Sequence, residues 1–589
     1  MNAPVHVARN EAGKIDATRQ AEVPAPTRNT ARRRWCIGIA AATIWSVSRV
    51  GVSGEHINTR GWSSFWKFWS AAVRPTLNQE FLTLTLRAAA TTVSFAVVGT
   101  VLSTVIGLVG APLLAQRLWE QPGNRSVLRR TIRTATFRLL RTAAAVPRSV
   151  HEIVWALLLV QVFGTDPIVA ILAIGIPFGA VSASVFADTI DDAATHAHDN
   201  LRAAGAPRLA ALTYSIGPTV AADMTGYVFY RFECAIRTAA ILGVIGAGGL
   251  GFQMQLSFQT LRYSEMWTLI YALVLIAGGA DLWSSAIRRR QSRSIARCGE
   301  LRFPEGHHRS LATPRTHASP RYHDRLLRGS FLALIAAAPV AGWWIDFNPT
   351  VLWDQRRQSL MSELIRDMFP PRYGPGGFSG LWSAAVDTAA MSVVAIVVSV
   401  ALGLLFATFS ARPVSAATAS ARAPRVWDIT RRFVVRAMML VLRAIPPHVW
   451  AFLAALILFP GAWPGIVALA AYNTGIMARL FGETLEDVDP RTEESLLAQG
   501  ARPTARLFYA TLPAAAARII ALSAYRWEVI MRETVIVGVV GAAGLGRLIQ
   551  DDLVARDFAA VTSTIGALVI MTIGASALSK RLRNSLATT

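Results

Sequence analysis

Cysteine and charge are both scarce in this sequence of 589 residues. Cys36, Cys234 and Cys298 are scattered through apolar or linker surroundings, which argues against a disulfide framework and against a cysteine-based metal site. Only 16% of the residues are charged, whereas 53% are hydrophobic and the mean hydropathy is +0.39, so the chain is too apolar for a soluble protein of this size. The sequence also has no Gly-x4-Gly-Lys-Ser/Thr phosphate loop, so ATP hydrolysis is expected in another polypeptide and not in this chain.

Long apolar runs take the place of charge. A helix needs about 20 apolar residues to cross a bilayer, and the sequence has many windows of that kind. In the first half they are 35–52, 84–114, 139–163, 168–186, 219–236 and 266–286. In the second half they are 326–345, 381–409, 434–458, 465–481, 514–531 and 558–578. We therefore predict an all-α polytopic membrane protein with six spans in each half and about twelve in all.

Negative charge is the scarcer sign, since 36 Asp and Glu stand against 59 Lys and Arg and give a formal net charge of +23. The placement of the basic residues argues against nucleic acid as the partner. They crowd into residues 1–34, 117–133, 288–328, 412–436 and 580–583. The intervening connections 53–80 and 346–380 have near-balanced charge and carry Trp62, Trp66, Trp69 and Trp353. This is the positive-inside pattern, so we expect a multi-pass protein of the cell membrane, in contact with lipid, with both termini and the central linker cytoplasmic.

An internal duplication organises the chain. The stretch from Asp199 to Gly251 recurs from Glu494 to Gly546 at a constant offset of 295, and 20 of the 47 positions from Gly205 onward are identical. An even number of spans in each copy lets the two copies lie in parallel. We assign a disordered cytoplasmic arm (1–34), a first repeat (35–286), a cytoplasmic linker (287–325) and a second repeat (326–585).

Each repeat contains a short polar helix that ends at a glycine and returns to an apolar segment at a proline. In the first copy this segment includes Asp199, Gly205 and Pro218; in the second it includes Glu494, Gly500 and Pro513. A short helix, a glycine turn and a return at proline predict a protruding knob on the positive side, shaped to enter a groove on a partner. The alternative for these segments is a solvated turn without a partner.

These segments resemble the EAA loop of ABC-transporter permeases, in which Glu-Ala-Ala precedes a Gly and then a Leu-Pro pair. The second copy keeps Glu494, Gly500 and Pro513, whereas the first has Asp199 in place of Glu. Downstream, Tyr-Arg-Phe-Glu-x-x-x-Arg and the run Gly-Val-Ile-Gly-Ala-Gly-Gly-Leu-Gly resemble the phosphonate-uptake branch of that family, over roughly 500 residues. Members of that branch usually carry one six-helix unit and pair as homodimers, so the chain resembles a fused duplicate.

The resemblance implies the MetI-like fold of ABC importer permeases, in an inner-membrane transport subunit that is not an enzyme and carries no cofactor or metal. It also implies two ATPase subunits bound at the knobs through Asp199, Gly205, Pro218, Glu494, Gly500 and Pro513. An external binding protein would deliver phosphonate or a related phosphorus oxyanion. Phosphite, phosphate or methionine as the solute remains an alternative. An ion-coupled secondary transporter with twelve helices in parallel repeats is the competitor from another class.

A charged set lies inside the apolar segment of each copy: Arg231, Glu233, Arg237, Arg526, Glu528 and Arg532. Charges within a span are costly and usually face a partner or a water-filled path. We expect Arg231 and Arg526 to line the substrate path, each neutralised by the Glu two positions later when the path is empty. The alternative is an Arg–Glu pair that only holds helices together.

The remaining candidates for chemistry are weak. The glycine-rich runs at Gly246 and Gly541 follow apolar helices and not strands, so they indicate close helix packing or a re-entrant piece and not a dinucleotide site. His196 and His198 lie in a polar loop without ligand partners at metal-binding spacing. No Ser/His/Asp or Cys/His arrangement stands out.

Overall fold

The computed structural model describes residues 28–51, 57–119, 127–193, 196–299, 325–411 and 426–587. Regular structure in these ranges is helical, apart from one isolated bridge between Ile57 and Leu458, so the all-α prediction is confirmed. Most of the predicted arm and of the predicted linker lies outside the described residues.

The two halves present the same order of helices. The first half contains α1 (Arg28–Val50), α2 (Trp62–Ala71), α3 (Gln79–Leu114), α4 (Gln116–Trp119), α5 (Val127–Ser149), α6 (Glu152–Phe163), α7 (Pro167–Asp192), α8 (His196–Ala203), α9 (Arg208–Ala211), α10 (Gly217–Leu242), α11 (Gly249–Gln259) and α12 (Tyr263–Gly299). The second half contains α13 (Arg325–Trp344), α14 (Gln355–Asp367), α15 (Gly377–Ser410), α17 (Val426–Ala444), α18 (Pro447–Ile457), α19 (Ala462–Glu486), α20 (Arg491–Ala498), α21 (Pro503–Arg506), α22 (Leu512–Val539), α23 (Leu545–Val554) and α24 (Phe558–Ala587). Helix α12 thus continues into the segment that we assigned to the linker.

Among the described residues, seven helices are long and apolar enough to cross a membrane, or ten if each of three bent helix pairs counts as one span. The two other predicted spans fall on α1 and α19, which do not reach the same apolarity. Helix α19 is nevertheless packed among α15, α17, α18 and α22, so its polar residues face protein and not lipid. The chain is therefore a multi-pass membrane protein built from two parallel repeats.

The third predicted span of each repeat is not one straight helix. Helices α5 and α6 meet at 84°, and helices α17 and α18 meet at 93°. Proline explains both breaks: Pro147 lies just before the first bend, and Pro446 and Pro447 occupy the second. The His151 side chain accepts a hydrogen bond from the Ile153 amide at 3.2 Å and so caps the start of α6.

The first helix of each repeat packs on the opposite repeat. Helix α1 lies against α15, and helix α13 lies against α3. Arg49 of α1 donates a hydrogen bond from Nε to Asp387 Oδ1 at 2.9 Å, and Trp344 of α13 donates one from Nε1 to Thr91 Oγ1 at 3.4 Å. The two repeats are therefore interlocked and do not merely lie side by side.

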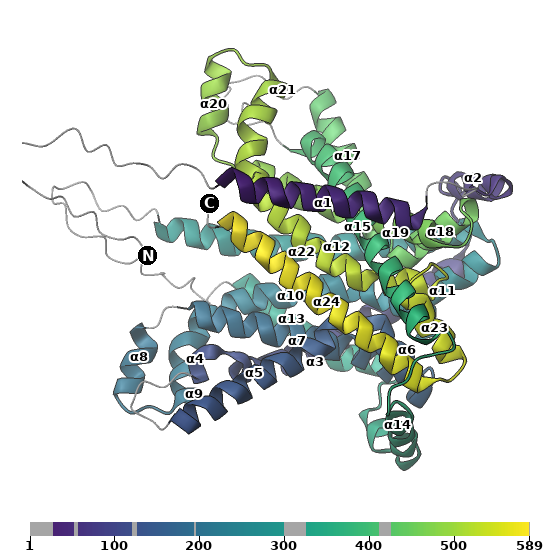
Figure 1. Ribbon diagram of the computed structural model, residues 1–589, viewed down its shortest axis with the longest axis horizontal. Coiled ribbons are helices and arrows are strands. Elements are labelled where there is room, and N and C mark those ends of the chain that lie inside the picture. The colour runs from purple at the N-terminus through teal and green to yellow at the C-terminus, as the bar shows by residue number, and fades with distance from the viewer. Residues whose placement is uncertain are drawn as a thin grey trace, which may run out of the picture.

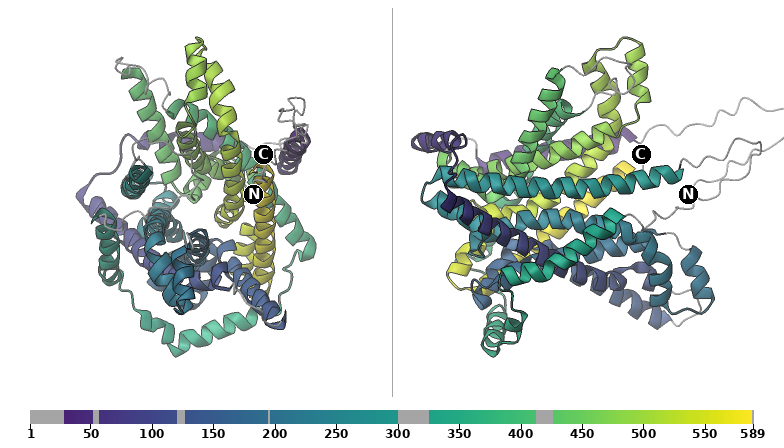
Figure 2. Two further views of the ribbon diagram at one scale, coloured as in Figure 1. Left: turned by 90° about the vertical axis from the view of Figure 1, so that its left-hand side faces the viewer. Right: turned by 180° about the vertical axis from the view of Figure 1, so that it is seen from behind.

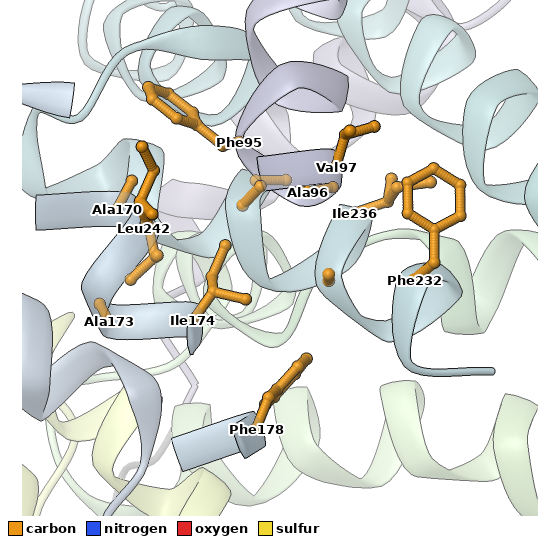
Figure 3. Close-up of a cluster of buried hydrophobic side chains, with 14 of the residues drawn as sticks. Phe95, Ala96, Val97, Ala170, Ala173, Ile174, Phe178, Phe232, Ile236 and Leu242 are labelled. Atoms are coloured by element: carbon orange, nitrogen blue, oxygen red, sulfur yellow. The ribbon is translucent and has the colours of Figure 1, made fainter. Parts of the chain in front are cut away.

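Small residues let the helices of each core approach closely. Helix α3 packs on α7, where a Cβ on Gly99 would lie 2.8 Å from Ile174 Cγ2. Phe95, Ile174 and Leu242 fill the space between α3, α7 and α10 (Figure 3). Phe178 stands apart from the other labelled side chains of this cluster, further along α7.

The glycine-rich runs form tight breaks after α10 and α22, as close packing predicts. A Cβ on Gly243 would lie 2.5 Å from the Phe252 amide nitrogen, and one on Gly538 would lie 2.6 Å from the Gly546 Cα. A buried threonine caps each following helix: Thr92 Oγ1 accepts from the Leu250 amide at 2.9 Å, and its counterpart in the second repeat does the same. Helices α11 and α23 are thereby fixed against the core.

Both knobs protrude at the same end of the molecule, where α1 begins and α24 ends (Figures 1 and 2). Hydrogen bonds place two further basic segments at this end: Arg117 donates to the Ala193 carbonyl at 2.9 Å, and Arg436 donates to Glu486 at 2.9 Å. The described parts of these basic segments therefore lie at the same end as the knobs.

Candidate functional site

Each knob ends in the same glycine turn. Gly205 has φ +89° and Gly500 has φ +79°, both in the left-handed region. In the first knob the Ala206 amide donates to the Leu201 carbonyl at 3.0 Å, and in the second the Ala501 amide donates to the Leu496 carbonyl at 3.0 Å. This is a Schellman cap, which needs a residue with φ > 0 and is usually glycine for that reason. The predicted glycine turns are present in both copies.

The prolines lie inside continuous helices and do not start separate ones. A π-helical turn precedes each proline, at Leu212–Ile216 before Pro218 and at Leu507–Thr511 before Pro513. Proline lacks an amide donor and its ring clashes with the carbonyl four residues back, and a π turn relieves both problems. Helices α9 and α21 therefore run on into α10 and α22, so each knob is rigidly joined to a span that reaches the interior.

The acidic residues at the two knobs differ in exposure and in contacts. Asp199 is exposed and Glu494 is half-buried, so both are open to a partner. Glu493, which the sequence analysis did not single out as functional, accepts from Arg506 Nη1 at 3.5 Å and from Thr511 Oγ1 at 3.3 Å. It ties α20 to the π turn. The first knob has His198 and Ala211 at the matching positions of Glu493 and Arg506, so it lacks this tie.

A cavity of about 360 Å³ lies between the two repeats. Of its 26 lining residues, 20 form ten pairs related by the same offset of 295. The pairs are Arg148/Arg443, Glu152/Pro447, Pro177/Tyr472, Val181/Ile476, Tyr230/Tyr525, Arg231/Arg526, Cys234/Val529, Arg237/Arg532, Thr238/Glu533 and Ile241/Ile536. The cavity is therefore shared equally by the two copies and lies on the axis that relates them.

Positive charge dominates the cavity wall, which contains seven arginines and four glutamates. Three of the arginines belong to one compensated chain of ion pairs that crosses from the first repeat to the second. Arg237 pairs with Glu233 at 2.5 Å, and Arg443 lies 4.0 Å from Glu233 and 2.7 Å from Asp281. Arg479 continues the chain to Asp281 and to Glu483. These charges neutralise one another, so this chain stabilises the interface between α10, α12, α17 and α19.

Arg526 is also compensated. Its Nη2 donates to Glu533 Oε1 at 2.7 Å, and its Nε donates to the side-chain oxygen of Asn473. The Asn473 amide in turn donates to Glu533 Oε2 at 3.0 Å, which closes a buried triangle between α19 and α22. Each member is satisfied by the other two, so the triangle holds the guanidinium in place.

Arg231, at the matching position of the first repeat, has no carboxylate partner within the described part of the chain. Its Nε donates to the Tyr227 hydroxyl at 2.8 Å, and its guanidinium carbon lies 4.7 Å from the centre of the Phe178 ring. Within the described residues, Arg148 donates only to Ser184 Oγ at 3.5 Å, and Arg532 donates only to the Arg148 carbonyl at 2.6 Å. Three arginines thus bring uncompensated charge to the cavity.

The predicted neutralisation of each arginine by the glutamate two positions later is wrong. Glu233 pairs with Arg237 and not with Arg231, and Arg526 pairs with Glu533 and not with Glu528. Residues at i and i+2 point to different sides of a helix and do not face each other. Glu528 does not line the cavity. The other five predicted path residues, Arg231, Glu233, Arg237, Arg526 and Arg532, do.

Sequence reasoning missed several contributors to the cavity and its ion pairs, among them Arg148, Arg443, Arg479, Asp281 and Asn473. The offset of 295 relates Arg148 to Arg443 and was the signal that could have indicated these two. Among the described residues no group of three or more His, Cys, Asp or Glu side chains could hold a metal ion.

Comparison with known proteins agrees with this architecture. Residues 403–587 match the family described as binding-protein-dependent transport system inner membrane component. The chain is 28% identical over 483 residues to the phosphate-import permease protein PhnE of Mycolicibacterium smegmatis, covering 82% of this chain and 81% of that protein. It is 27% identical to the phosphite transport system permease protein PtxC of Stutzerimonas stutzeri, over 38% of this chain and 76% of that one. It is 32% identical to the cryptic phosphonate transport system permease protein PhnE2 of Escherichia coli (strain K12), over 20% of this chain and 97% of that one.

The fold and the site define a helical transport subunit whose two repeats enclose one arginine-rich cavity. The chain belongs to the family of binding-protein-dependent transport system inner membrane components, the permeases of ABC importers, within its phosphonate-type branch. An alignment of 483 residues to one such permease runs through both repeats, so the chain is a tandem duplicate in a single polypeptide.

Proposed function

We propose that this chain is the permease subunit of an ATP-driven importer that moves phosphonate or a related phosphorus oxyanion across the cell membrane. The observation that carries the proposal is the arginine-rich cavity between the repeats. A volume of about 360 Å³ lies near the lower end of the range for ligand sites, ~300–1,000 Å³, and suits a small solute. A planar guanidinium fork matches the oxygens of a phosphorus oxyanion in pairs.

The partners follow from the two ends of the molecule. We propose that the knobs around Asp199, Gly205, Pro218, Glu494, Gly500 and Pro513 receive two ATPase subunits on the cytoplasmic side. The gathering of basic segments and of both described chain ends at the knob end supports this orientation. An external binding protein would deliver the solute to the opposite end, near α2, α14 and the α11–α12 connection. The names of the relatives, which concern phosphate, phosphite and phosphonate, support the class of solute.

Uptake of radiolabelled phosphate, phosphite and methylphosphonate tests this function in a strain that lacks the chain and is complemented with it. We expect restored uptake of at least one of the three, abolished by depletion of ATP and retained when an uncoupler collapses the ion gradient. Loss of uptake with the gradient, at normal ATP levels, would instead indicate an ion-coupled secondary transporter. Uptake of methionine in place of all three phosphorus compounds would refute the substrate class.

A further inference from the structure

The two repeats contribute unequal arginines to the cavity that they share. Arg231 and Arg526 occupy matching positions, yet Arg526 is bound by Glu533 and Asn473, and Arg231 has neither partner. Two sequence differences cause this. Phe178 stands where the second repeat has Asn473, and Thr238 stands where it has Glu533. The duplication placed an arginine at the same position of both repeats. Later sequence divergence left only Arg231, in the first repeat, without a carboxylate partner in the described part of the chain.

Two of the three uncompensated arginines contact α7. The Arg231 guanidinium stacks over Phe178, and Arg148 reaches Ser184. These two contacts are six residues apart on α7, which is about 9 Å along a helix that rises about 1.5 Å per residue. Arg532 arrives from the second repeat and bonds the Arg148 carbonyl, while its Nε is buried without a partner. Three guanidinium groups without a carboxylate partner in the described part of the chain therefore border the same cavity.

The other four arginines of the cavity are each bound to a carboxylate: Arg237, Arg443, Arg479 and Arg526. Glu152 is the one cavity carboxylate outside these pairs, and it lies 3.0 Å from His151 Nε2. A mobile anion gains from an arginine only the attraction that a resident carboxylate has not already taken up.

We propose that the cavity holds its anion at a single, off-axis subsite formed by Arg148, Arg231 and Arg532, and that Arg526 belongs to the frame that Glu533 and Asn473 stabilise. The two halves of the permease therefore play different parts, in spite of their common origin. The subsite takes a small oxyanion with one or two negative charges; its assignment to phosphorus oxyanions rests on the proposed function. The first repeat supplies two of the three arginines and the second repeat supplies one.

Second-site rescue distinguishes a frame arginine from a binding arginine. The Arg526→Gln substitution leaves the Glu533 carboxylate uncompensated beside the path, so we expect the KM for phosphate or methylphosphonate uptake to rise. Adding Glu533→Gln removes that carboxylate and should return KM to within about threefold of the unsubstituted importer, because a hydrogen-bonded pair replaced on both sides costs little. The matched control is Arg231→Gln, where loss of a charged hydrogen bond predicts a rise of about tenfold or more. Adding Glu533→Gln to Arg231→Gln should not restore KM.

Two outcomes of these uptake measurements would overturn the proposal. If Glu533→Gln fails to rescue Arg526→Gln while the double variant is produced in normal amount, Arg526 binds the anion and the site is symmetric. If Arg231→Gln leaves KM unchanged, the off-axis subsite is wrong. Arg148→Gln and Arg532→Gln provide two independent repetitions of the Arg231 result.

A second readout does not depend on transport. Cys234 lines the same cavity, and with Cys36 and Cys298 replaced by serine it becomes the one thiol of the full-length chain. Inorganic phosphate should slow alkylation of Cys234 in the purified chain, and this protection should persist in the Arg526→Gln/Glu533→Gln variant and disappear in Arg231→Gln. Protection with this pattern but no uptake of a phosphorus compound would refute the proposed function and leave the subsite standing. Equal protection in all variants would overturn the subsite.

Discussion

At the scale of single residues, helix geometry decides which charges meet. Arg526 and Glu533 are seven residues apart and so lie on the same face of α22, two turns apart, whereas Arg526 and Glu528 point to different sides. The identities of the charged residues were readable from the sequence. Their pairing was not, because Asn473 and Asp281 come from other helices and carry no sign of their partner in the local sequence. Five of the six predicted path residues nevertheless line the cavity.

A residue-scale prediction concerns the helix break after α10. A Cβ on Gly251 would overlap the carbonyl oxygen of Ala240, which is backbone and cannot move aside. We expect Gly251→Ala to destabilise the chain by about 1–3 kcal/mol, as overpacked sites do, and to lower its apparent Tm in detergent. Gly279→Ala is the matched control, since a Cβ there meets nothing within 4 Å in α12. Similar Tm values for the two variants would contradict this account of the glycine-rich run.

At the scale of elements, the local sequence predicted turns and helix ends better than it predicted which side chains pair. Glycine followed by proline predicted both knobs. The break in the third span, at Pro147 and Pro446, was found in the structure. The size of that break was not predictable, because composition alone cannot separate a straight span from two helices at 84°. The π turns before Pro218 and Pro513 were likewise hidden, since they depend on how a continuous helix accommodates a missing donor.

The glycine turns of the knobs give an element-scale prediction. A side chain in the left-handed conformation costs roughly 1–2 kcal/mol, so Gly500→Val should distort the second knob, and Gly205→Val the first. Space is not the issue, because a Cβ at either position meets nothing within 4 Å. We expect lower co-purification of the ATPase and slower uptake, with an unchanged Tm of the membrane part. Gly500→Val should have the larger effect, since that copy keeps Glu494 and the Glu493–Arg506 tie; full uptake by both variants would refute a docking role.

At the scale of the whole molecule, the exchange of first helices makes the two repeats interdependent. Helix α1 covers α15 and helix α13 covers α3, so each repeat alone exposes a face that the other repeat would cover. The sequence predicted two parallel repeats from the offset of 295 and from span parity. It could not predict the exchange, because two apolar helices carry little information about which neighbour they prefer in a membrane.

Cutting the chain between the repeats tests this interdependence. We expect the halves 1–310 and 311–589, produced together, to co-purify through a tag on one of them and to restore part of the uptake. Each half produced alone should be degraded or aggregate, which size-exclusion chromatography of a fluorescent fusion would show. A stable, monodisperse single half would mean that the exchanged helices contribute little to stability.

The fusion of the two interlocked repeats also allows a substitution to affect one half of the permease and not the other. In a dimer of identical subunits every substitution appears twice, once on each side of the axis. A single gene for both halves fixes their stoichiometry at one to one, and the covalent order guarantees that unlike halves always meet. Phe178 and Asn473, which occupy matching positions, can therefore be inherited together although they differ. The route across the membrane can become asymmetric, because a first repeat always assembles with a second repeat and never with another first repeat.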